Sequence, residues 1–66
     1  HINVFDLLDS NFFGEGKSFR SIQSRLIKLV NEYNLAEVPD DIQIKDWLEH
    51  NCQKSGTKYL LKDNSD

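Results

Sequence analysis

The sequence contains only one cysteine, Cys52, and two histidines, His1 and His50. A lone cysteine excludes a disulfide within the chain, and neither histidine has a cysteine partner at the spacing of a structural zinc site. The sequence therefore predicts a domain that holds no metal ion and no other cofactor. Its stability must come from side-chain packing, from oligomerisation, or from the rest of a larger protein.

Long apolar runs and methionine are also absent. No stretch approaches the roughly 20 apolar residues of a membrane span, and the first residues lack the basic start and apolar core of a signal peptide. We therefore expect no contact with a membrane. We interpret the lack of methionine, even at position 1, as the mark of an excised domain or a processed piece. The single thiol favours a reducing, intracellular setting.

The chain is short but rich in aromatic side chains. With 66 residues it forms at most one domain, residues 1–66, near the lower limit for independent folding. Four Phe, two Tyr and one Trp argue against disorder across the middle of the chain. We expect a core of this size to contribute no more than about 3–5 kcal/mol of net stability, and it leaves little room for an enclosed catalytic cavity.

The charges are segregated along the sequence. The formal net charge is −3, whereas chains that bind phosphate backbones are usually basic. The charged residues in 17–31 are all basic, namely Lys17, Arg20, Arg25 and Lys28. Those in 50–62 are also all basic, namely Lys54, Lys58 and Lys62. Residues 32–49 are acidic except for Lys45. Such blocks can neutralise one another across a small helical bundle, or they can serve a partner.

Two apolar patterns in the first half of the chain predict helices. Residues 2–13 place Ile2, Phe5, Leu8 and Phe12 near helical spacing, up to a break at Gly14 and Gly16. Residues 18–34 carry one apolar face formed by Phe19, Ile22, Leu26, Leu29, Val30 and Tyr33. Ser18 stands at the N-cap of this second helix and Asn34 at its C-terminal cap.

The second half predicts one more helix and a short strand. Pro39 ends the connection 35–39, and Asp40 with Asp41 starts a helix that runs to about residue 51. Its inner stripe is Ile44, Trp47, Leu48 and Cys52, with Ile42 at the entry of the helix and Trp47 as the central core residue. Ser55 and Gly56 follow as the helix stop, residues 57–62 alternate as a strand does, and residues 63–66 form a frayed tail. The predicted fold is mainly α, a compact three-helix domain with a C-terminal strand.

None of the motifs predicts catalysis. Gly14-Glu15-Gly16-Lys17-Ser18 ends like a phosphate-binding loop, but the first glycine of that motif and the preceding strand are missing, so a loop and a helix cap explain it better. Cys52 lies on the inner face of the third helix, where a thiol is usually inert. No serine stands in a nucleophile elbow. We expect no enzymatic activity and no small-molecule substrate.

A helix that carries Trp and Leu leads through a glycine turn into a basic strand in the segments Ile44–Leu48 and Lys54–Tyr59. This arrangement resembles helix-turn-helix and winged-helix domains. Among these, it is similar to the accessory modules at the ends of phage and plasmid primase-helicases. The resemblance covers about twenty residues. It implies that Lys54, Lys58 and Lys62 are phosphate contacts of the wing. It also implies that Gln43, Lys45 and Asn51 are the polar side chains of the presented helix.

Two functions remain open from the sequence. The first is binding of DNA or RNA through backbone phosphates, by the outer face of the second helix (Arg20, Arg25 and Lys28) and the basic final strand. The second is a protein-interaction or oligomerisation module that uses the charge blocks and an exposed C-terminal strand, with another protein or a second copy as partner.

Overall fold

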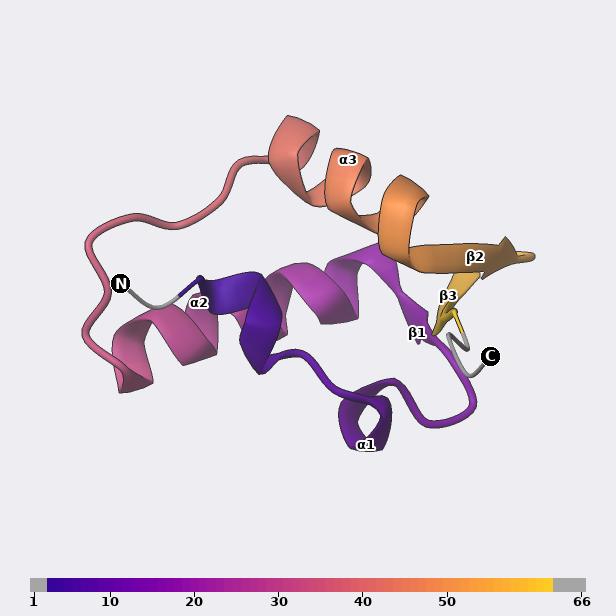
Figure 1. The fold of residues 1–66 in the computed structure, drawn as a ribbon, viewed down its shortest axis with the longest axis horizontal. Coiled ribbons are helices and arrows are strands. Elements are labelled where there is room, and N and C mark those ends of the chain that lie inside the picture. Colours follow the sequence, from indigo (N-terminus) through magenta and orange to yellow (C-terminus); the bar gives the residue numbers. More distant parts are fainter. Residues whose placement is uncertain (1–2, 63–66) are drawn as a thin grey trace.

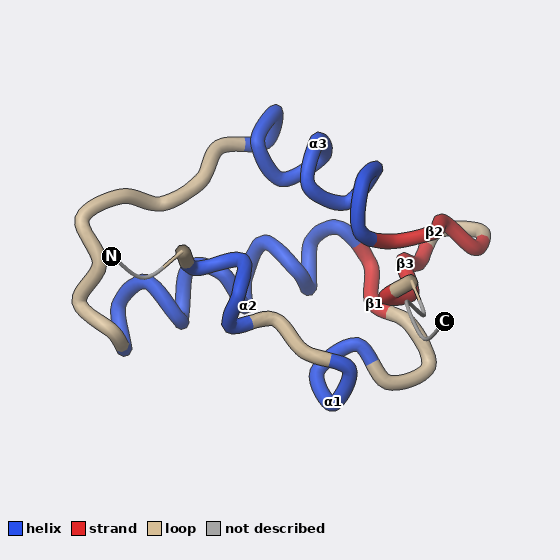
Figure 2. Tube along the Cα trace, viewed as in Figure 1, coloured by secondary structure: helices blue, strands red, loops and turns tan. Residues whose placement is uncertain are grey.

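The computed structural model describes residues 3–62. Its elements are η1 (Val4–Leu7, a 3-10 helix), α1 (Ser10–Phe13), β1 (Lys17–Ser18), α2 (Phe19–Glu32), α3 (Asp41–Asn51), β2 (Cys52–Ser55) and β3 (Lys58–Leu61). Helix α2 runs along the molecule, with α3 above it and α1 below it in this view, and η1 is drawn across α2 (Figure 1). Figure 2 shows the three strands gathered at one end. The domain is mainly helical, as predicted, and the tail predicted for residues 63–66 lies outside the described residues.

Helix α2 forms where the apolar stripe predicts it. The Ser18 hydroxyl accepts a hydrogen bond from the Ser21 N–H at 3.2 Å and caps its start. At the end of the helix Asn34 has a φ of 56°. The Leu35 N–H donates to the Val30 carbonyl at 2.9 Å and the Asn34 N–H donates to the Asn31 carbonyl at 3.3 Å, so two of the last carbonyl groups of the helix are satisfied. Tyr33, predicted on the inner face, is 47% exposed because the helix ends there.

Helix α3 also forms as predicted. Asp40 Oδ1 accepts from the Gln43 N–H at 2.9 Å, and Gln43 Oε1 accepts from the Asp40 N–H at 3.0 Å, so two otherwise free N–H groups are satisfied reciprocally. Ile44 and Leu48 are buried, which confirms the inner stripe. Ile42, at the entry of the helix as predicted, is 79% exposed.

The single helix predicted over residues 2–13, of which Ile2 lies outside the described residues, is wrong. Leu8 and Asp9 are extended, and they separate η1 from α1. Asn3 Oδ1 accepts from the Phe5 N–H and Asp9 Oδ1 accepts from the Phe12 N–H, each at 3.0 Å. These short polar side chains start two separate helical turns, because they offer the backbone an alternative to a continuous helix.

The strand predicted at residues 57–62 exists as β3, but it belongs to a sheet that the sequence did not indicate. The sheet is antiparallel with the order β1-β3-β2, so β3 is the central strand. Ser55 and Gly56 are not a helix stop: α3 ends at Asn51, and Gly56, with a φ of 65°, opens the two-residue turn between β2 and β3. Only glycine adopts this conformation at little cost.

The core joins the helices and strands β2 and β3 through one apolar cluster. Its fully buried side chains include Phe13, Ile22, Leu26, Ile44 and Leu48. Trp47 was predicted as the central core residue, but it is half-buried and packs against this cluster from the side. Its ring stacks on Phe5 at 5.3 Å and on Phe13 at 6.3 Å between centroids, with interplanar angles of 15° and 16°. The stack therefore ties η1 and α1 to α3.

Cys52 closes the core at the junction of α3 and β2. Its side chain is 4% exposed. Burial raises the pKa of the thiol from 9.0 to about 11, and the nearby Lys62 ammonium opposes this shift. The thiol therefore stays protonated at neutral pH, as expected of an inert buried cysteine.

Replacing the capping residue should test how far α3 depends on its first turn. We expect Asp40→Ala to lower the free energy of unfolding by about 1 kcal/mol, because it frees the Gln43 N–H. Glu49→Ala, on an exposed position of the same helix, should change it by less than about 0.5 kcal/mol. Urea denaturation followed by circular dichroism measures both. Equal losses in the two variants would contradict a role for the cap.

The buried thiol should be protected from alkylation. At pH 8 we expect iodoacetamide to modify Cys52 far more slowly in the folded protein than in urea, because the folded state disfavours the thiolate. Between pH 9.0 and about 11 the unfolded chain loses the thiol proton while the folded chain keeps it. The free energy of unfolding should therefore fall as the pH rises through this window, and Cys52→Ala should lack that contribution. Equal alkylation rates in the folded and unfolded protein would disprove the burial.

Candidate nucleic-acid interface

The ion pairs among the described residues leave the lysines and arginines out. Within residues 3–62, the single ion pair shorter than 4.0 Å joins His50 Nδ1 to Asp46 Oδ1 at 3.7 Å, on the exposed side of α3. No lysine or arginine of this range forms such a pair with a carboxylate of the same range. The interpretation that the charge blocks neutralise one another across the bundle therefore finds no support at contact distance.

Aromatic rings, and not carboxylates, are the close neighbours of three cations. Lys17 Nζ lies 5.7 Å and Arg25 Cζ 5.4 Å from the centroid of the Phe12 ring. Lys45 Nζ lies 5.8 Å from the centroid of Phe19, the first residue of α2. Cation–π contacts of this kind hold a charged group in place without cancelling its charge. These cations therefore keep their field for a ligand.

The sheet adds further lysines in a fixed register. Lys17 of β1 and Lys54 of β2 both pair with Tyr59 of β3. Residues directly opposite one another on neighbouring strands project from the same face of a sheet, so Tyr59 lies between the two lysines. Lys58 pairs with Ser18 and projects from the opposite face. The predicted wing lysines Lys54 and Lys58 are thus both exposed, on opposite faces of one hairpin.

The basic outer face predicted for α2 does not exist as one surface. Arg20 and Lys28 are exposed, but Arg25 is half-buried because its guanidinium turns to Phe12 of α1. Lys62 follows β3, and its N–H donates to the Asn51 carbonyl at 3.0 Å. It therefore lies at the end of β3 opposite to Lys58. The structure brings Arg25 and Lys54 towards the sheet end and leaves Lys28 and Lys62 apart from them.

Helix α3 does not offer the polar side chains that the resemblance implies. Gln43 is engaged in the capping box, and the Asn51 Nδ2 donates to the Trp47 carbonyl at 2.9 Å. Lys45, the third of these side chains, lies at the edge of α3 with its ammonium group over the Phe19 ring. The exposed positions carry the acidic residues Asp41, Asp46 and Glu49. An acidic surface repels phosphates, so α3 is unsuited to enter a DNA groove.

The glycine loop before α2 has no phosphate-loop geometry. Helix α1, and not a strand, precedes it, and Lys17 lies in β1 against Phe12. Gly16 is required for another reason. A Cβ placed on it would lie 3.3 Å from the Lys58 Cβ, so the glycine allows the loop to cross close to β3. The interpretation as a loop followed by a helix cap is confirmed by the Ser18 hydrogen bond.

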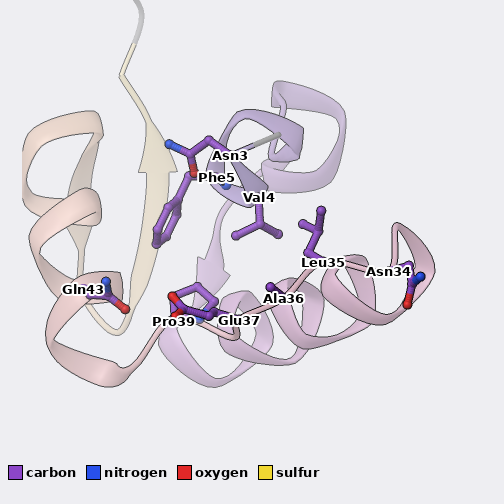
Figure 3. A pocket seen from close by; sticks show the side chains of 9 residues that line it. All are labelled: Asn3, Val4, Phe5, Asn34, Leu35, Ala36, Glu37, Pro39 and Gln43. Atoms are coloured by element: carbon purple, nitrogen blue, oxygen red, sulfur yellow. Dashed lines mark hydrogen bonds between the residues drawn. The ribbon is translucent and has the colours of Figure 1, made fainter. Parts of the chain in front are cut away.

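A groove of about 680 Å³ lies at the other end of the molecule, between η1 and the connection from α2 to α3. Figure 3 shows apolar side chains on both walls: Val4 and Phe5 from η1, and Leu35, Ala36 and Pro39 from the connection. Among the described residues that line it, Glu37 is the only titratable one. These lining residues contain no paired acid and base groups of the kind that acid–base catalysis uses.

The remaining functional features are limited. Across residues 3–62 no three His, Cys, Asp or Glu side chains gather in a way that could hold a metal ion. None of the helices in this part of the chain has the length and apolar character needed to cross a membrane. The buried Cys52 thiol is not available as a nucleophile.

Three residues that shape the basic surface were missed as site residues: Phe12, Lys17 and Tyr59. Lys17 was recognised as part of a basic block, but a two-residue strand is too short to show an alternating pattern. Phe12 is part of a predicted helix stripe and Tyr59 is part of a predicted strand. Neither pattern shows which cations lie beside these rings, because such contacts arise only from tertiary structure. The charge blocks were the one signal that could have pointed to them.

Compared with models of protein families, with curated proteins and with solved structures, the chain matches none of them.

Proposed function

We propose that this domain binds nucleic acid through phosphate contacts made by the basic side chains at its sheet end. One observation carries the proposal: among residues 3–62 no lysine or arginine lies within 4.0 Å of a carboxylate oxygen of the same range, although acidic residues outnumber basic ones in the chain. A domain that used these charges for its own stability would pair them. Free cations at defined positions are what phosphate binding requires.

The positions of the cations support the same proposal. Lys17, Lys54 and Lys58 lie on the sheet, and Arg20 lies in the first turn of α2, directly after β1. Lys45 approaches the same helix start. Strand pairing fixes these side chains relative to one another, so several phosphates can be contacted without ordering a loop.

The fold supports the proposal by analogy. A β2–β3 hairpin follows α3, as the wing follows the third helix in the winged-helix domains that the sequence resembles. Fold alone does not establish function. The acidic face of α3 departs from that analogy, so the proposal assigns binding to the hairpin and the start of α2. It includes no reading of bases by α3.

The second candidate function is protein interaction or oligomerisation. It is favoured by the acidic face of α3 together with the exposed apolar side chains Val38 and Ile42, which are 50% and 79% exposed. The C-terminal strand of this alternative, β3, is the central strand of the sheet: β2 pairs along its whole length and β1 pairs with Lys58 and Tyr59, so only a short part of one edge is left for a partner strand. A positive sheet end of one copy facing the acidic helix of another remains a physically sound arrangement.

Neutralising lysines of the hairpin should weaken nucleic-acid binding in a salt-dependent manner. We expect labelled oligonucleotides to bind with an affinity that falls as salt rises, and Lys54→Gln and Lys58→Gln each to reduce the slope of log K against log salt by about 0.7–0.9. Fluorescence anisotropy with DNA and RNA, single-stranded and duplex, measures this. Lys28→Gln, the same charge change on an exposed site of α2 distant from the sheet, should have a smaller effect.

Two results would contradict the proposal. Absence of binding to every oligonucleotide at low salt would exclude it. Equal effects of Lys28→Gln and Lys54→Gln would show that only total charge matters, and that the sheet end is no defined site. Sedimentation of the same samples tests the second candidate: self-association that Asp46→Asn or Glu49→Gln disrupts would support the acidic face of α3 as the contact surface.

A further inference from the structure

We infer that the nucleic acid bound at the sheet end is single-stranded, and that the Tyr59 ring stacks against one of its bases while the Phe12 ring holds two of the cations that face its phosphates. This inference rests on the proposed function and names the ligand class of the same site. It is drawn from five residues that follow one another across the surface as Arg25, Phe12, Lys17, Tyr59 and Lys54, which we call the cation–aromatic row.

The order of the row follows from contacts and from strand register. Arg25 and Lys17 both lie within 6 Å of the Phe12 ring centroid, at 5.4 and 5.7 Å. Lys17 is then directly opposite Tyr59, and Tyr59 is directly opposite Lys54 on the other side. Neighbouring strands lie about 4.8 Å apart, so the three sheet members span about 10 Å. Lys17 is the neighbour of both rings. In this order Phe12 stands between Arg25 and Lys17, and Tyr59 stands between Lys17 and Lys54.

The two rings are fixed but not enclosed. Phe12 and Tyr59 are half-buried, and both pack against the core cluster. Phe12 also makes an edge contact with Phe13, with the centroids 5.3 Å apart and an interplanar angle of 70°. A ring held on one side by the core loses little freedom when a ligand stacks on it, so the contact is made at low entropic cost.

Alternating cations and rings match a single strand better than a duplex. In a duplex the faces of the bases are covered by neighbouring bases, and a protein reads only their edges from the grooves. An unpaired strand exposes base faces that stack on aromatic rings, while its phosphates lie against positive charges. Helix α3, the element that would have to enter a groove, is acidic on its exposed side. The surface therefore offers what a single strand needs and lacks what groove reading needs.

The test compares probes of equal phosphate charge. Anisotropy is measured with oligothymidine of about 12 nucleotides, with an abasic strand of the same length, and with a duplex of matched charge. We expect oligothymidine to bind about 5-fold or more tightly than the abasic strand, the range that one stacked base contributes. Tyr59→Leu should remove most of that difference, whereas Tyr33→Leu, the same substitution at an exposed position outside the row, should leave it unchanged. Oligouridine shows whether RNA serves as well as DNA.

A second measurement on the unaltered protein keeps the test decisive if Tyr59→Leu fails to fold. Ring protons of Phe12 and Tyr59 should shift in NMR spectra when oligothymidine is added, and those of Tyr33 should not. Equal binding of the abasic strand and oligothymidine, or tighter binding of the duplex, would overturn the inference and leave the proposed phosphate-binding function intact. No binding of any probe at low salt would overturn both.

Discussion

Burial of α2 against α3 is the contact on which the rest of the domain depends. Ile22 and Leu26 on one helix and Ile44 and Leu48 on the other belong to one cluster and are at most 1% exposed. Apolar burial of this kind is the main source of stability in a chain whose single cysteine cannot form a disulfide within it. Because a domain of this size has only a few kcal/mol of net stability, the hydrogen bonds that fix the ends of both helices are a sizeable fraction of it.

The surface chemistry follows from how the N-terminal segment packs on that pair of helices. The interruption at Leu8 and Asp9 allows the consecutive residues Phe12 and Phe13 to take different roles. Phe13 enters the core, where it is 1% exposed and stacks on Trp47, while Phe12 stays half-buried at the surface between Lys17 and Arg25. A single uninterrupted helix would present another set of side chains. The break in the helix thus creates the aromatic centre of the basic surface.

The features predicted correctly from the sequence are those that local chemistry determines. Ser18 and Asp40 cap helices at the expected positions, and the stripes of α2 and α3 point inward, because capping and amphipathic spacing act within one or two turns. The helix predicted over residues 2–13 was wrong because Asn3 and Asp9 compete with an apolar pattern that suits a helix equally well. The sequence predicts only one strand of the sheet, because β1 has just two residues and its partner β3 is distant in the sequence. For the proposed site, the sequence identifies the basic residues but not the aromatic rings beside them, because contacts such as that of Arg25 with Phe12 exist only in the folded state.

The central place of β3 has a consequence for how the domain assembles. Helices α2 and α3 and the β2–β3 hairpin are closed by contacts between near neighbours in sequence, which form within microseconds. Docking β1 on β3 joins Lys17 to Tyr59, about 40 residues later, and this loop closure carries the largest entropy cost of any strand pairing in the fold. We expect β1 to dock late in folding, with the segment around Gly14–Lys17 opening more readily than the hairpin. The topology of the chain, and not any one side chain, then limits how quickly the folded surface is completed.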